Sequence, residues 1–348
     1  MARIRSVRSK FARQFTTILG LTALTALTAA CNTPMSTTVL GGSDNEAIWG
    51  PYTLIMWLAG IVFVVIMAIT AAFTLMFRER PGRQAIQMHG NTRLEVIWTM
   101  IPVAIVVAMA VPTISTIQTQ AAPPPADALK VVAIGHQWWF EFQYPDLGIS
   151  TANELRIPEG KPVHFELRTV DVIHSFWVPQ IAGKVDMVPG HTNFLTFSAN
   201  TARPEPYLGQ CAELCGFSHA NMRFRVFVDT PADFDTWTKS ATAKAATPVS
   251  PLAKQGQEIF NRSACIGCHT VNGTAAQGKT APDLTHVGAR TTIGAGIIEN
   301  NERNLVKWIS NSADFKPGSL MPPMGKAAGG ALSEEEITAV AAYLLELK

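Results

Sequence analysis

The sequence predicts three parts in series: a pair of membrane-spanning helices, an antiparallel β-sandwich and an all-α domain. Three observations predict this multi-domain class. The chain has 348 residues, more than one hydrophobic core usually organises. Its excess of apolar residues lies before Gln120, and strand-like and then helical patterns follow. The net charge of +2 gives no reason to expect nucleic acid as a partner.

Residues 1–31 have the features of a secretory signal. Basic residues at the start precede the apolar run 15–27 and the small residues before Cys31. Cleavage before Cys31 would resemble bacterial lipoprotein processing, in which the thiol is acylated, although Thr28 stands where Leu is usual. Plain signal cleavage is the alternative, and the sequence leaves both open.

Residues 32–120 are expected to form a hairpin of two transmembrane helices. The range 52–77 contains no charged residue, and 96–117 is also apolar. A helix needs about 20 such residues to cross a bilayer. The arginines between the two ranges are Arg78, Arg80, Arg83 and Arg93. Basic residues mark the cytoplasmic side, so everything after the hairpin is predicted to lie outside the membrane.

Residues 121–237 predict the sandwich. The range 163–170 alternates apolar and polar residues, as a half-buried strand does, and 131–134, 192–197 and 222–228 are also strand-like. Residues 238–251 are small, polar and proline-bearing, and we expect a flexible linker there. Residues 252–348 form the all-α domain, with helices predicted over 251–261, over 302–311, and from Ser333 to Lys348 after a capping box with Glu336.

A cluster of soft metal ligands occurs within the sandwich region. Cys211 and Cys215 are followed at short spacings by His219 and Met222. Thiolate, thioether and imidazole groups suit copper, and two thiolates can bridge two ions. Zinc is the main rival, but Met is a poor zinc ligand. A disulfide would leave the His and Met spacings unexplained. His174, at the end of an alternating strand, is a candidate for a further nitrogen ligand.

A second motif lies in the all-α domain. Cys265, Cys268 and His269 form the attachment sequence of a c-type haem, in which two thioethers hold the haem and the His is an axial ligand. Met321, in a loop rich in Pro and Gly, is the expected second ligand, with Met324 as the weaker candidate. His/Met ligation raises the haem potential relative to bis-His. All five cysteines then have roles, and no disulfide is predicted.

These motifs together resemble subunit II of the haem–copper cytochrome c oxidases. The range 211–222 is similar to the binuclear copper motif of that family, and 171–175 to the segment that carries its other histidine. The aromatic run 135–140 and the helix start 94–102 also match, so the likeness covers roughly residues 45–230. Residues 252–348 resemble the small bacterial cytochromes c. The resemblance implies that the sandwich is cupredoxin-like.

The resemblance also implies roles for individual residues. Cys211 and Cys215 would bridge two copper ions, with His174, His219 and Met222 as terminal ligands. Glu213 would offer its carbonyl to copper and its carboxylate to a magnesium ion shared with the catalytic subunit. Electrons from cytochrome c would enter at Trp138. Glu95 would stand at the mouth of a proton channel in the catalytic subunit; without the family it reads as a solvated charge at a helix end.

Two positions depart from the family pattern. Phe140 stands where Trp is frequent, which bears on the surface for an external donor. His191 stands where Arg is usual, which bears on one contact to the catalytic subunit.

The predicted function is therefore subunit II of a proton-pumping cytochrome c oxidase, with one covalently bound haem c fused at its C-terminus. Electrons would pass from the haem to the copper pair and then to a catalytic subunit that reduces oxygen to water. The expected partners are subunit I, a subunit III, the bacterial cell membrane, and a donor such as a cytochrome c or a quinol–cytochrome c reductase. The flexible linker would let the haem domain swing between donor and copper.

Two alternatives share this copper chemistry, and a third belongs to a different class of protein. A nitric oxide reductase component uses similar parts, but Glu95 favours the oxidase. Nitrous oxide reductase needs a second, histidine-rich copper cluster, which eight scattered histidines do not provide. A copper-delivery or thiol redox protein would need neither Met222 nor Trp138 nor a fused haem domain.

Overall fold

The computed structural model describes residues 33–79, 81–82 and 89–348. The signal segment with Cys31, and the arginines Arg80 and Arg83, lie outside the described residues. The chain divides into two compact units, residues 44–124 and the remainder. The larger unit contains both the sandwich and the all-α domain.

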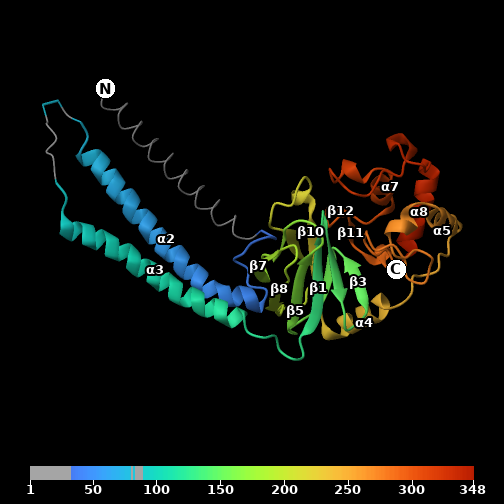
Figure 1. Cartoon of the computed structure of the whole chain (residues 1–348), viewed down its shortest axis with the longest axis horizontal. Helices are drawn as coiled ribbons and strands as arrows, with labels where there is room; N and C mark the ends of the chain where they lie inside the picture. Colours follow the sequence, from blue (N-terminus) through green and yellow to red (C-terminus); the bar gives the residue numbers. More distant parts are fainter. Residues whose placement is uncertain (1–32, 80, 83–88) are drawn as a thin grey trace, which may run out of the picture. The chain divides into compact units, whose positions relative to one another are not determined.

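The smaller unit is a pair of long apolar helices, α2 (Ser43–Met76) and α3 (Thr92–Gln120). Both are long and apolar enough to cross a membrane, with mean hydropathies of 2.7 and 2.3. The side chain of Gln120 donates to Asp44 Oδ1 at 2.5 Å, which joins the end of α3 to the start of α2. The helices are therefore antiparallel neighbours (Figure 1). Their apolar side chains are exposed, as lipid-facing side chains are.

The sandwich is built from two sheets of five strands each. The first has the order β3 (Ile149–Ala152), β2 (Trp139–Tyr144), β1 (Leu129–His136), β5 (Val163–Thr169) and β8 (Asn193–Phe197). The second has the order β4 (Glu154–Pro158), β10 (Arg223–Asp229), β9 (Tyr207–Cys211), β6 (His174–Val178) and β7 (Ala182–Met187). Neighbours are antiparallel except in two pairs, β1 with β5 and β4 with β10. The predicted sandwich is confirmed, with these two parallel pairs added to it.

Aromatic side chains from both sheets fill the space between them. Phe140 lies 4.8 Å from Phe224, and Phe224 lies 4.9 Å from Phe176, measured between ring centroids. All three are fully or almost fully buried. Phe140 therefore belongs to the core, and its departure from the family pattern falls inside the domain rather than on a docking surface.

Helix α4 (Pro231–Ala241) follows β10, the last strand of the sandwich. It extends into residues 238–241, which belong to the range 238–251 predicted as a free linker. Thr230 caps the helix, and Phe234 and Trp237 pack against the sandwich core, so the helical conformation continues through 238–241. The rest of the segment is held by the all-α domain. The backbone amides of Val249 and Ser250 donate to the Glu346 carboxylate at 2.6 and 3.3 Å.

The all-α domain packs around the crossing of α5 (Pro251–Arg262) and α8 (Glu334–Glu346), with the short α6 (Cys265–Cys268) and α7 (Glu302–Ser310) beside them. Gly256 marks the crossing: a Cβ there would lie 1.9 Å from the Ala339 carbonyl oxygen, so only glycine lets the helices approach this closely. The predicted capping box of Ser333 and Glu336 is present at the start of α8. A two-stranded ribbon, β11 (Thr292–Ile293) and β12 (Ile298–Glu299), faces the sandwich.

Candidate copper and haem centres

The candidate copper loop runs between two strands of the second sheet. Cys211 is the last residue of β9, and its amide donates to the Met222 carbonyl at 2.9 Å, which closes the loop at its base. The amide of Ala212 donates to Ser175 at 3.2 Å and ties the loop to β6, whose first residue is His174. A short 3-10 turn, His219–Asn221, brings back the last two predicted ligands. The backbone thus gathers side chains from separate strands and turns.

The predicted ligand atoms converge at this point. Cys211 Sγ lies 3.7 Å from Cys215 Sγ and 3.8 Å from His174 Nδ1. Cys215 Sγ lies 3.6 Å from His219 Nδ1 and 3.8 Å from Met222 Sδ. The carbonyl of Glu213 is 3.2 Å from Cys211 Sγ. All six predicted positions therefore come together. His174, Cys211, Cys215 and Met222 are buried, Glu213 and His219 are partly exposed, and the soft donor set fits copper.

The two thiols influence each other strongly because they are close and buried. A hydrogen bond from Cys215, with a further contribution from His174, lowers the pKa of Cys211 well below its ordinary value. The hydrogen bond with Cys211, followed by burial, raises the pKa of Cys215. One sulfur is thus ready as a thiolate, which is the form that binds a metal ion.

Asp171 orients His174 and was not singled out by sequence reasoning. Its Oδ1 is 2.8 Å from His174 Nε2, which leaves Nδ1 directed at the cysteines. Burial alone would raise the pKa of Asp171, but hydrogen bonds from His174, Gln137 and Val172 hold that pKa below its usual value. The spacing of an acid three residues before a predicted ligand could have indicated this role. Gly135 leaves room for the imidazole, since a Cβ there would lie 2.7 Å from His174 Cδ2.

Three residues with predicted roles lie outside the ligand cluster. The Glu213 side chain is partly exposed and has no hydrogen bond or ion pair within the described part of the chain. His191 is exposed in the turn after β7, where its amide donates to the Val188 carbonyl at 3.1 Å. Glu95 lies in the first turn of α3, which Asn91 caps, and it is exposed.

Trp138 lies directly beside the copper loop. Its indole Nε1 and the Gln137 side-chain amide donate to the Cys215 carbonyl at 2.9 and 2.8 Å. The other side of the indole is covered by the all-α domain: a Cβ on Gly318 would lie 2.9 Å from Trp138 Cη2. Only 6% of Trp138 is exposed. The residue thus stands between the copper loop and the loop that carries Met321, and is not at a free surface.

The candidate haem site is a cavity of about 360 Å³ in the all-α domain. Cys265, Cys268, His269, Met321 and Met324 all line it, together with apolar side chains from α5, α7 and α8. Trp138 and Trp139 of the sandwich line its edge. A cavity of this size within a core suits a large flat apolar group, and the two thiols on one helical turn fit covalent attachment.

His269 lines the cavity and has a fixed ring orientation. Its Nδ1 is 2.7 Å from the Pro282 carbonyl, and since a carbonyl only accepts, Nδ1 carries the hydrogen. Nε2 is then the nitrogen with a free lone pair. Burial lowers the pKa of His269, which favours the neutral form that binds iron. Met321 is partly buried in its loop, whereas Met324 is buried in the core with its backbone bonded to Ile309 and Leu332.

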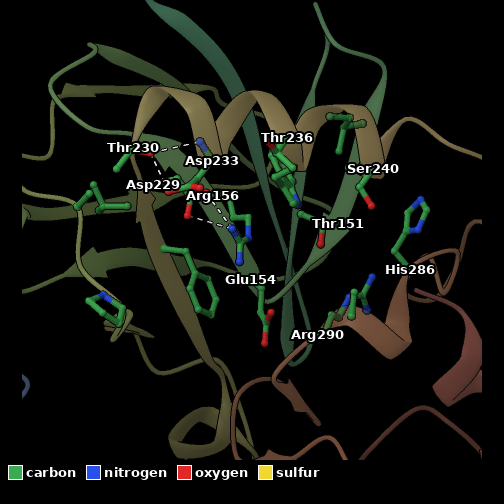
Figure 2. Close-up of a pocket in the computed structure, with 18 of the residues that line it drawn as sticks. Thr151, Glu154, Arg156, Asp229, Thr230, Asp233, Thr236, Ser240, His286 and Arg290 are labelled. Atoms are coloured by element: carbon green, nitrogen blue, oxygen red, sulfur yellow. Dashed lines mark hydrogen bonds and ion pairs between the residues drawn. The ribbon is translucent and has the colours of Figure 1, made fainter.

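Arg290 is a second site residue that sequence reasoning missed. It lines the haem cavity and also a cavity of about 700 Å³ between α4, β4 and the segment 283–290 (Figure 2). A cation at the edge of an apolar cavity suits the carboxylates of a haem. Burial lowers the pKa of Arg290, although nearby Glu154 and Asp283 oppose this shift. Arg290 lies in the sequence between the Cys265–His269 motif and the loop of Met321 and belongs to neither, so sequence reasoning had no pattern by which to find it.

Three protein-family profiles match the chain. They are the transmembrane domain of cytochrome c oxidase subunit II over residues 43–116, its periplasmic domain over 148–228, and cytochrome c over 253–348. Together they follow the three parts of the structure in the same order.

One curated relative matches almost the whole length of the chain, and others match parts of it. Cytochrome c oxidase subunit 2 of Alkalihalophilus pseudofirmus is 37% identical over 95% of this chain and 96% of its own. The protein of the same name from Bacillus sp. strain PS3 is 40% identical over 78% of this chain and 80% of its own. The periplasmic domain of cytochrome oxidase subunit II from Bradyrhizobium japonicum, a solved structure, is 30% identical, covering 34% of this chain and 96% of its own, with a TM-score of 0.33. The chain belongs to the cytochrome c oxidase subunit II family, in the form that carries a cytochrome c domain.

Proposed function

We propose that the chain passes single electrons from its haem domain, through the copper loop, to a catalytic oxidase subunit that reduces oxygen to water and pumps protons. The observation that carries the proposal is the position of Trp138, bonded to the Cys215 carbonyl on one side and covered by the Met321-bearing loop on the other. The two candidate cofactor sites of the chain thus meet at one indole.

At the copper loop, the proposal assigns two ions to six residues. Cys211 and Cys215 supply the shared thiolates, and His174, His219, Met222 and the Glu213 carbonyl supply the remaining donors. Copper held by such ligands supplies one-electron redox chemistry. The protein contributes the buried surroundings and the orientation of each donor. Because the strands hold the ligands in place, little rearrangement has to accompany a change of charge.

In the haem domain, Cys265 and Cys268 would hold the single haem c covalently, and His269 and Met321 would be the ligands of its iron. The hydrogen bond from His269 to Pro282 fixes the ring and directs Nε2 into the cavity. His/Met ligation gives the haem a raised potential, which suits a donor to copper.

The surfaces of the chain indicate its surroundings. We assign Glu213, whose carboxylate has no partner in the described part of the chain, to a magnesium ion shared with the catalytic subunit. Glu95, exposed at the start of α3, is assigned to the entrance of the proton channel of that subunit. Arg78 and Arg93 lie at the two ends of the loop that joins the two helices. They favour a cytoplasmic position for this loop, which places the copper and haem domains on the outer face. A subunit III and an external cytochrome c or quinol–cytochrome c reductase complete the set of partners.

Purification of the complex from its source membrane tests this function. The large subunit that accompanies the chain is identified, and oxygen uptake and nitric oxide uptake are measured on the same sample. Uptake of oxygen with proton release, near-infrared copper absorption, and two coppers per haem c on the separated chain are expected. Uptake of nitric oxide alone would replace the oxidase by a nitric oxide reductase, and a chain with one copper and no near-infrared band would overturn electron transfer through a copper pair.

A further inference from the structure

Two sets of contacts fasten the haem domain to the copper domain, and residues of both sets, Trp138, Lys316 and Thr292, line the haem cavity. We name the first the Trp138 anchor, formed by Lys316, Pro317 and Gly318 against Trp138 and Ser218. We name the second the Glu154 anchor, formed by Glu154 with Thr291 and Thr292. Both lie inside the compact unit that contains the two domains.

The Trp138 anchor joins the loop of Met321 to the copper loop. Lys316, only 4% exposed, donates from Nζ to the Trp138 carbonyl, and a second carbonyl, that of Gly294, lies 3.4 Å away. Ser218, fully buried between two predicted copper ligands, donates from Oγ to the Pro317 carbonyl at 2.6 Å. Gly318 has φ of +80° and rests on the indole, where no side chain would fit.

The Glu154 anchor joins β4 of the sandwich to the start of the ribbon in the haem domain. One carboxylate oxygen of Glu154 accepts from the Thr291 amide and hydroxyl at 2.8 and 2.6 Å. The same oxygen accepts from the Thr292 amide and hydroxyl at 2.9 and 3.1 Å. Figure 2 shows Glu154 directed from the sandwich toward the segment of the haem domain that carries Arg290. Hydrogen bonds to an ionised acceptor are the strong ones, so four on one oxygen make a firm attachment.

We propose that Lys316 and Glu154 are positioning residues that keep the haem domain locked on the copper domain throughout turnover. The inference rests on the proposed function, because it concerns the orientation in which electrons pass between the two sites. Trp138 is covered in this state, so an external donor has to deliver electrons to the haem domain rather than to the copper domain. A haem domain swinging on its linker would have to exchange these hydrogen bonds for bonds to water at every release, and each exchange has a net cost.

Amide hydrogen exchange in the intact oxidase complex measures how often the domains separate. The Arg223 amide donates to Ala295 across the same boundary at 3.2 Å, so its exchange reports the opening. The variants Lys316→Met and Glu154→Gln keep size and remove charge, and Lys307→Met and Glu302→Gln on the exposed face of α7 are matched controls. Loss or weakening of these buried hydrogen bonds should speed Arg223 exchange about tenfold in each variant. The controls should exchange as the wild type does.

A kinetic measurement on the same proteins distinguishes a positioning role of Lys316 and Glu154 from a purely structural role. After photoreduction of the haem, the rate of copper reduction should be independent of solvent viscosity in the wild type. In the double variant it should fall and become viscosity-dependent, while Lys316→Arg, which keeps the cation, should remain close to the wild type. Unchanged haem and copper absorption shows that each site is intact.

Two results would overturn the proposed role of the anchors. One is Arg223 exchange that is unchanged in the double variant, and the other is wild-type electron transfer from haem to copper that slows in proportion to viscosity. If the haem is photoreduced but the copper of the wild type never is, the proposed function fails instead. The exchange data still decide on the anchors in that case.

Discussion

The copper and haem sites of this chain are prepared in opposite ways. At the copper loop, sulfur and nitrogen donors already lie 3.6–3.8 Å apart, and Cys211, Cys215 and Met222 belong to a core that aromatic and aliphatic side chains otherwise fill. In the haem domain the predicted ligands surround a cavity of about 360 Å³ within the core itself. The copper domain therefore has a complete core without its metal, whereas the haem domain needs the haem to complete its core.

Removing haem attachment should give the largest effect. In the double variant Cys265→Ser/Cys268→Ser, an unfilled 360 Å³ cavity would cost about 9 kcal/mol at ~24 cal/mol per Å³, comparable with the whole stability of a domain. We expect residues 251–348 to lose cooperative unfolding and to be digested by protease. Calorimetry should still show the transition of the sandwich. A variant whose haem domain unfolds as the wild type does would contradict the comparison.

Removing one copper ligand should abolish the metal site and leave the fold. Cys215→Ser takes away a sulfur that contacts three other donors, so the near-infrared band should disappear and bound copper should fall by at least half in elemental analysis. The sandwich should lose only about 1 kcal/mol, since a small buried group is exchanged for another. If the unfolding transition of residues 125–229 vanished too, the copper loop would be as dependent on its metal as the haem domain is on haem.

The two methionines of the haem cavity should behave differently. Met321→Ala should give a high-spin haem or a sharply lowered potential, because the expected axial thioether is lost. Met324→Ala should leave the spectrum unchanged but cost about 2–5 kcal/mol, as the truncation of a buried core side chain does. Redox titration and thermal unfolding of both variants make the comparison. The opposite pattern would transfer the ligand role to Met324.

Substitution of a residue that hydrogen-bonds a copper ligand should have the smallest effect. Asp171→Asn weakens the hydrogen bond that orients His174, and loss of such a partner typically lowers metal affinity about 10–100-fold. Copper retention against a series of chelators measures this. Asp146→Asn, in the exposed turn after β2, is the matched control and should retain copper as the wild type does. Equal retention in both variants would remove the orienting role of Asp171.

Sequence reasoning could propose the ligands because each motif is compact. Cys211 to Met222 and Cys265 to His269 are short stretches whose chemistry is visible before any fold is known. The contacts between the domains were out of reach, since Lys316 meets Trp138 178 positions away and Glu154 meets Thr291 137 positions away. The predicted linker was wrong over 238–241 for a related reason. Small polar residues suggest a free chain, but the packing of Phe234 and Trp237 on the sandwich extends the helix beyond them.

The chemistry of the Glu154 anchor bears on how ionic strength affects this oxidase. Its four donors are backbone amides and hydroxyls, which carry no net charge, and the carboxylate is only 8% exposed. Dissolved ions screen attraction between exposed opposite charges far more than they weaken buried bonds to neutral donors. Electron transfer between the haem and the copper should therefore be nearly insensitive to salt. Any salt dependence of the whole enzyme would then report the encounter of the haem domain with its external donor.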